Sequence, residues 1–196
     1  MIRQVGALRG ERGDKMLSGC AFRAQLVTPG QRELFDYWVR SAGERPMPAR
    51  SEFDPLKVPH LLPHLGLIDL RNGIDQGLFR LAGTRLRDIY GKEITGKRID
   101  EVFSGDCAAY WRRIHARVAK KGLPAHGVVR GPAAGRDHVV LFWLRLPLSE
   151  DGGQVDRILC HDVAGPSDAD QVPAEFTLYH YPRARSLSPA PRAQYG

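Results

Sequence analysis

The chain has 196 residues, of which 42% are hydrophobic and 26% charged, a composition that suits one globular domain with some length to spare. Its net charge of +7 comes almost entirely from the ends, because residues 1–30 hold five basic and two acidic residues and residues 181–196 hold three arginines and no acid. The nearly neutral remainder does not predict nucleic-acid binding. The sequence has neither an apolar run of about 18 residues nor a secretory leader, so it indicates a cytoplasmic protein that is not inserted in a membrane.

The cysteines Cys20, Cys107 and Cys160 lie far apart and form no C-x-x-C pair. We therefore expect three reduced thiols, with no disulfide framework and no cysteine-based zinc site.

The chain divides into four segments. Residues 1–28 show no sustained periodicity and residues 164–196 end in a Pro-, Ser- and Arg-rich stretch, so we predict a flexible first segment and a largely flexible last one. Residues 29–64 are expected to form an N-terminal helix and a proline-rich connector. Residues 65–163 are expected to form the main domain.

The first half of the chain predicts an amphipathic helix, a strand pair and two short helices. The stretch Q-R-E-L-F-D-Y-W-V-R-S-A places Leu34, Tyr37 and Trp38 on one side of a helix. Two strands follow, joined by a turn that contains Asn-Gly. The strands are expected at 65–70 and 78–82, and the short helices at 84–90, closed by Gly91, and at 99–103.

The second half predicts one long helix and three strands. Trp111, Ile114 and Val118 recur at helical spacing within residues 107–121. The strands are expected at 125–130, 137–148 and 155–162. This order of elements predicts a single α+β domain built on an antiparallel sheet.

Both faces of the longest predicted strand are apolar. Val140, Phe142, Leu144 and Leu146 alternate with Leu141, Trp143 and Arg145, so both faces need a cover. The N-terminal helix with Phe35, Tyr37 and Trp38 is expected to cover one face, and a second subunit is the alternative. In either case we expect Trp143 to pack near Tyr37 or Trp38.

Two motifs suggest chemistry that their context does not support. His60 and His64 stand four apart in H-L-L-P-H, but prolines at 55, 59 and 63 predict two successive turns in place of a continuous helix, so we expect surface histidines and no metal site. The stretch G-K-E-I-T-G-K-R (91–98) ends in arginine where a phosphate-binding loop needs Ser or Thr, and it follows a helix in place of a strand. Gly91 and Gly96 are predicted to be a helix stop and a turn residue.

Taken together, several motifs resemble the short stand-alone bacterial PAS-domain family. They are L-F-D-Y-W (34–38), P-x-R-x-x-x-D-P (48–55), L-L-P-H-L (61–65), F-R-L-A-G-T-R-L (79–86), Y-G-K-E-I-T-G-K-R-I (90–99) and L-P-L-S (146–149), and the resemblance covers about residues 31–163. It implies a five-stranded antiparallel sheet with short helices and one longer helix on one face, plus an N-terminal helical extension. It also implies a non-enzymatic sensory or regulatory module that binds a small ligand, a protein partner or both.

The resemblance leaves the cofactor unknown, because PAS domains variously hold flavin, haem, small metabolites or nothing. The flavin-reactive cysteine motif of light-sensing members has no match, His115 is a conceivable haem ligand, and a ligand-free dimerisation or scaffold domain stays open. The sequence also leaves open the partner, the oligomeric state and whether Met1 or Met16 is the natural start. Candidate pocket residues are Phe79, Leu81, Ile89, Tyr90, Trp111, Ile114, His115, Phe142, Leu144 and Cys160, and candidate interface residues are Phe35, Tyr37, Trp38 and Trp143.

Overall fold

The computed structural model describes residues 19–165 and 175–178 of the chain. Most of the two segments predicted to be flexible therefore lies outside the described residues. Residues 19–25, within the first of them, are helical; Phe22 in this helix and Leu26 directly after it are buried. The ring centre of Phe22 lies 4.9 Å from that of Phe35, so an apolar contact holds this short helix against Phe35. The local hydrophobic periodicity does not predict this contact.

The sheet has the strand order β2-β1-β5-β4-β3-β6, and every pair of neighbours is antiparallel. The five predicted strands are all present, which confirms the expected fold class, and β6 adds a sixth strand beside β3 from within the predicted C-terminal tail. The strands are β1 (Leu65–Asp69), β2 (Leu78–Ala82), β3 (Ala125–Arg130), β4 (Val140–Leu148), β5 (Arg157–Gly165) and β6 (Glu175–Leu178).

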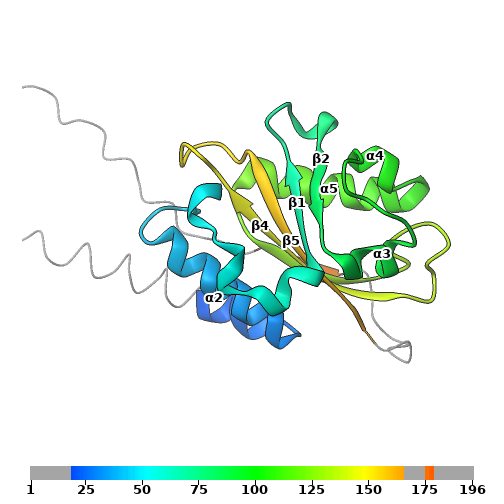
Figure 1. Cartoon of the computed structure of the whole chain (residues 1–196), viewed down its shortest axis with the longest axis horizontal. Coiled ribbons are helices and arrows are strands. Elements are labelled where there is room, and N and C mark those ends of the chain that lie inside the picture. The colour runs from blue at the N-terminus through cyan, green and yellow to red at the C-terminus, as the bar shows by residue number, and fades with distance from the viewer. Residues whose placement is uncertain (1–18, 166–174, 179–196) are drawn as a thin grey trace, which may run out of the picture.

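Helices cover both faces of this sheet (Figure 1). Those named are α2 (Pro29–Ala42), α3 (Thr84–Tyr90), α4 (Ile99–Val102) and α5 (Gly105–Lys121), with the short 3-10 helices η1 (Arg50–Glu52), η2 (Pro55–Lys57), η3 (Pro59–His64) and η4 (Ile74–Gln76). None of the helices in the described part of the chain is long and apolar enough to cross a membrane.

Local sequence signals fix the ends of these helices. Thr28 and Gln31 form a capping box at the start of α2. Gly91 and Gly122 end α3 and α5 in the left-handed conformation, with φ of 74° and 63°, which a residue without Cβ adopts at little cost. The helix stop predicted at Gly91 is confirmed.

The connector before β1 follows the predicted proline pattern, with one difference. Asp54 caps η2 by accepting a hydrogen bond from the amide of Leu56 (3.0 Å), and Pro59 opens η3. Pro63 lies inside η3 and does not end it. In a 3-10 helix, side chains three positions apart are aligned, so His60 and His64 diverge. His60 contacts Glu33 (2.9 Å), whereas His64 contacts the carbonyl oxygen of Asp162 (3.1 Å).

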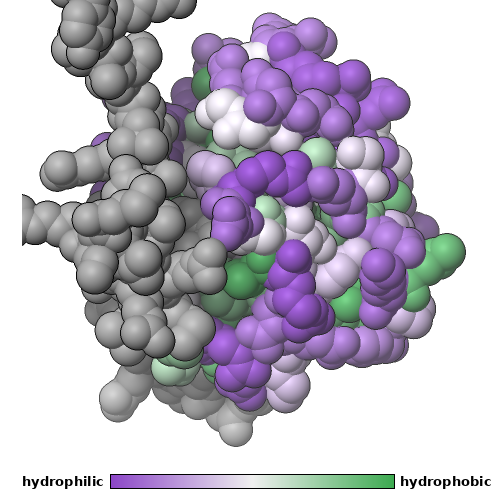
Figure 2. Space-filling model, turned by 90° about the vertical axis from the view of Figure 1, so that its left-hand side faces the viewer, coloured by the Kyte–Doolittle hydropathy of each residue, from purple (hydrophilic) through white to green (hydrophobic). Residues whose placement is uncertain are grey.

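The helix α2 lies on one face of the sheet, and its aromatic side chains point inward. Trp38 is fully buried, and its Nε1 donates a hydrogen bond to the carbonyl oxygen of Pro147 in β4 (2.9 Å). Phe35 and Tyr37 are buried as well. On the face of the molecule seen in Figure 2, most of the visible surface of the described residues is hydrophilic, with smaller hydrophobic areas between. The chain itself therefore supplies the cover that the apolar sheet face requires.

The prediction that Trp143 packs near Tyr37 or Trp38 is wrong. Trp143 contacts Tyr110 and Trp111 of α5, so its face of β4 is covered by α5. Phe142 and Leu144, predicted to face a cavity under the helices, lie on the α2 side, because alternate residues of a strand point to opposite faces. The sequence pattern assigned the residues of β4 correctly to two opposite faces, but the helices expected to cover these faces are exchanged.

Candidate functional site

A fully buried ion pair joins β4 and β5 beneath α5. Arg145 and Asp162 are both 0% exposed. They share one face of the sheet, since Asp162 pairs with Trp143, two residues from Arg145. Arg145 Nη1 donates to Asp162 Oδ1 at 2.6 Å and Nη2 donates to Oδ2 at 3.2 Å. This is the two-armed geometry in which a guanidinium binds a carboxylate most strongly.

Two helices are tied to this pair. From the last residue of α3, the hydroxyl of Tyr90 donates to Asp162 Oδ2 (2.8 Å). Arg145 Nε donates to Nε2 of His115 in α5 (3.2 Å). The ion pair and these two hydrogen bonds, which we call the buried network, link the sheet to both helices.

Aromatic rings enclose the guanidinium. Its carbon lies 4.7 Å from the ring centre of Trp111 and 5.6 Å from that of Trp143, within the range of cation–π attraction. Phe103 stacks on Trp111 at 5.3 Å, and His115 stacks on the same indole at 5.6 Å. Large side chains therefore fill the layer between the sheet and α5 around Arg145.

The electrostatics of the network fix its protonation states. Burial by itself lowers the pKa of Arg145, but the charge of Asp162 and smaller contributions outweigh it and raise the pKa above its ordinary value. Burial, reinforced by Asp162, raises the pKa of Tyr90 well above 10.0. Burial and then Arg145 lower the pKa of His115 well below 6.5. At neutral pH the Arg145 guanidinium is therefore charged, whereas the Tyr90 phenol and the His115 imidazole are neutral.

One hydrogen-bonding group of the network has no partner among the described residues. Because His115 Nε2 accepts from Arg145, the neutral ring carries its proton on Nδ1. This buried N–H makes no hydrogen bond within the described part of the chain. An unpaired buried donor costs about 1–3 kcal/mol, so this position in the layer favours an added acceptor such as a water molecule or a ligand oxygen.

The structure brings together some of the predicted pocket residues and separates others. Tyr90, Trp111 and His115 belong to the buried network or its aromatic surround, and Cys160 lies opposite Arg145 on the same face of the sheet. Phe79, Ile89 and Ile114 are also buried. Burial raises the pKa of the Cys160 thiol to about 12, which makes it a poor nucleophile.

Leu81 was expected beside Phe79 but is 49% exposed. The pairing of β1 with β2 shifts by one residue between Leu67 and Ile68, so Ile68 faces Phe79 while Leu67 faces Leu81. A bulge of this kind reverses the alternation of side chains. It turns Leu81 to the opposite face, away from α5.

The central residues Arg145 and Asp162 were not among the sequence candidates. A signal for Arg145 is present, because it is the one charged residue within the apolar run V-V-L-F-W-L-R-L-P-L, and a charge on a doubly covered strand needs a partner. Its partner depends on the register of β4 and β5, which the sequence pattern does not specify.

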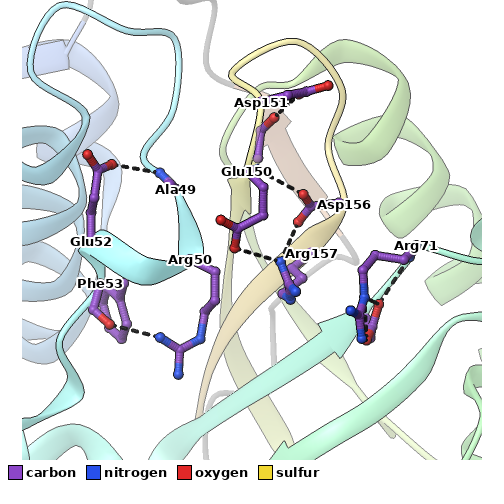
Figure 3. A network of polar contacts seen from close by, with 11 residues as sticks. Ala49, Arg50, Glu52, Phe53, Arg71, Glu150, Asp151, Asp156 and Arg157 are labelled. Carbon is purple, nitrogen blue, oxygen red and sulfur yellow. Dashed lines mark hydrogen bonds and ion pairs between the residues drawn. The ribbon is translucent and has the colours of Figure 1, made fainter.

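A second polar network lies around the turn between β4 and β5 (Figure 3). Arg157 Nη1 donates to Glu150 (3.0 Å) and to Asp156 (2.9 Å), and Arg71 pairs with Asp69. Most of these side chains reach solvent, where such pairs contribute little stability. They satisfy the polar groups of the turn and leave the buried network as the stronger candidate site.

Comparisons with known proteins agree with this architecture. A family model described as "PAS domain" matches residues 26–161. None of the curated proteins matches the sequence.

Solved structures to which this chain is similar include a LOV protein of Rhodobacter sphaeroides, which is 18% identical with a TM-score of 0.44 over 59% of this chain and 69% of that chain. The PAS domain of BvgS from Bordetella pertussis is 17% identical, with a TM-score of 0.43 over 58% of this chain and 88% of that chain. VqmA bound to DPO is 14% identical, with a TM-score of 0.41 over 56% of this chain and 57% of that chain. By the extent of the family match, this chain belongs to the PAS domain family, whose fold is typical of sensory modules.

Proposed function

We propose that the chain is a non-enzymatic regulatory module of a bacterial signalling system, acting in the cytoplasm, and that the layer around the buried network is its sensing layer. The observation that carries this proposal is the link from the Arg145–Asp162 pair to α3 through Tyr90 and to α5 through His115. A ligand or partner that alters these bonds changes how two helices rest on the sheet. That is a population shift between two helix arrangements, read by a second protein.

The proposal includes a small ligand with an acceptor oxygen for the unpaired Nδ1 of His115. The pocket residues are then Tyr90, Trp111, His115 and Cys160, together with Arg145 and Asp162. The non-enzymatic role is supported by the high pKa of Cys160 and by the burial of both Cys160 and His115. The Cys160 thiol lacks the thiolate state that a nucleophile requires, and neither side chain is accessible to a substrate.

A scaffold function is the second candidate, and the filled layer favours it. Trp111, Phe103 and Trp143 occupy the space around Arg145 that a large cofactor needs. Because His115 is stacked on Trp111 and accepts from Arg145 through Nε2, this arrangement does not favour a haem. A scaffold would bind its partner, or a second copy, with the layer left as it is.

The experiment that separates these functions is native mass spectrometry of the purified full-length chain, combined with an absorption spectrum. A regulatory module with a small ligand retains an added mass without visible absorbance, whereas a haem or flavin sensor absorbs visible light. The ligand part of the proposal is contradicted if the purified chain has its unmodified mass and if no metabolite mixture shifts its melting temperature. The scaffold function is then the remaining candidate.

The proposed link between the network and α3 has its own test. Tyr90→Phe removes one hydroxyl and its bond to Asp162, so amide hydrogen exchange in α3 should accelerate. Tyr37→Phe is the matched control, because it removes a hydroxyl that bonds the backbone of Asp54 on the other side of the sheet. Equal exchange of α3 in the wild type and in Tyr90→Phe would contradict the link.

A further inference from the structure

A hollow of about 270 Å³ opens beside the buried network, between the end of α3, α4 and the loop that joins β3 to β4. Tyr90 is one of its lining residues. The same side chain, 2% exposed, donates its hydroxyl to Asp162. The hollow therefore shares one residue with the buried network.

Two cationic side chains line the hollow. Lys92 donates from Nζ to the carbonyl oxygen of Glu101 (2.9 Å), and Arg136 donates from Nη2 to the carbonyl oxygen of Asp88. Both acceptors are backbone atoms, and neither cation forms an ion pair with a described residue. The hollow therefore carries two positive charges that no carboxylate of the described residues contacts.

Further donors of the lining residues lack acceptors among the described residues. The Nε of Arg136 is buried and makes no hydrogen bond within the described part of the chain. This nitrogen would lie 2.8 Å from a Cβ at position 91, so glycine there permits the approach. The amides of Ala134 and Gly135, in the same loop, donate no hydrogen bond to any described residue. Unpaired amides beside cationic groups are a common arrangement for binding oxyanions.

From this combination we propose that the hollow binds a small oxyanion, a phosphate or a short-chain carboxylate, through Lys92, Arg136 and the loop amides. Its volume lies just below the roughly 300–1,000 Å³ of pockets for drug-sized ligands, so it suits a small anion better than a nucleotide or flavin. The inference deepens the proposed function. It rests on that function only for one step, the transmission of binding through Tyr90 to Asp162. The stretch G-K-E-I-T-G-K-R contributes Lys92, but as a loop lysine and not as part of a phosphate-binding loop.

The test is calorimetric titration of the full-length chain with inorganic phosphate and, separately, with succinate, at low ionic strength because salt screens exposed charges. Lys92→Gln removes one cation from an exposed position, and Arg136→Lys keeps the charge but removes the forked donors. Arg80→Gln is the matched control, because Arg80 is an exposed arginine of β2 that does not line the hollow. Circular dichroism and urea midpoints establish that each variant folds. If Arg136→Lys does not fold, Lys92→Gln alone is sufficient for the test.

We expect saturable binding of one of the two anions, weakened about tenfold or more by each hollow variant and unchanged by Arg80→Gln. Preference for phosphate identifies a phosphoryl source and preference for succinate a carboxylate source. The inference is overturned if neither anion saturates, or if the hollow variants bind as tightly as the wild type. If Tyr90→Phe changes neither the anion affinity nor the amide hydrogen exchange of α3, the anion site stands and only the transmission step through Tyr90 is refuted.

Discussion

Replacing the buried ion pair with apolar side chains tests the energetic core of the proposed sensing layer. Arg145→Met leaves the Asp162 carboxylate buried, with the Tyr90 hydroxyl as its remaining partner among these groups. Asp162→Leu leaves the guanidinium with only His115 and the carbonyl oxygen of Leu144. Both side chains are 0% exposed, so each single variant leaves an uncompensated charge without water and should cost about 3–5 kcal/mol.

The double variant removes both charges together. If the two residues acted independently, the losses would add to about 6–10 kcal/mol. With both charges gone, the remaining cost is the loss of partners for the Tyr90 hydroxyl and His115 Nε2, about 1–3 kcal/mol each. We therefore expect a coupling free energy of about 2 kcal/mol or more, with the double variant more stable than the sum of the single losses allows.

The assay is urea unfolding followed by tryptophan fluorescence, since Trp38, Trp111 and Trp143 are all buried and report on both layers. Should a single variant fail to fold, Asp162→Asn keeps the shape of the side chain and removes only its charge. Additive losses in the double-mutant cycle would refute the reasoning, because they would mean that water or another group compensates each charge separately.

Three further predictions concern the pH dependence of stability, two glycine substitutions and the reactivity of a thiol. Burial lowers the pKa of His161 to about 3 and that of His126 to about 4, so below about pH 6.5 the unfolded chain binds protons that the folded chain does not. The free energy of unfolding should therefore fall as pH decreases, by up to about 1.4 kcal/mol per pH unit for each histidine until its folded pKa is reached; urea midpoints that stay unchanged from pH 7 to 5 would contradict this. Gly91→Ala should destabilise more than Gly96→Ala in thermal unfolding, because both glycines have positive φ but only the first meets a side chain, and equal losses would show that the arginine contact is irrelevant. Cys160 should react with a thiol reagent only after unfolding, since it is 0% exposed; rapid labelling of the native chain at this position would disprove its burial.

The sequence by itself determined the elements and the family. Hydrophobic periodicity indicated each named strand from β1 to β5 and each α-helix from α2 to α5 to within a few residues, because these signals depend on neighbours three, four or two positions away. Gly91 and Gly122 ended their helices, and Asp54 capped its turn, for equally local reasons. Of the candidate pocket residues, Trp111 was found in the same way, as a member of the apolar face of its helix.

Only the tertiary structure decided which face of the sheet is covered by α2 and which by α5. Both faces of β4 are apolar, so alternation separated Trp143 from Leu144 without specifying which of them meets α5. The partner of Arg145 depended on the register of β4 against β5, and the position of Leu81 on a one-residue shift between β1 and β2. A strand's side chains reverse face with every one-residue change of register, and the register is set by long-range pairing and packing, not by neighbours along the chain.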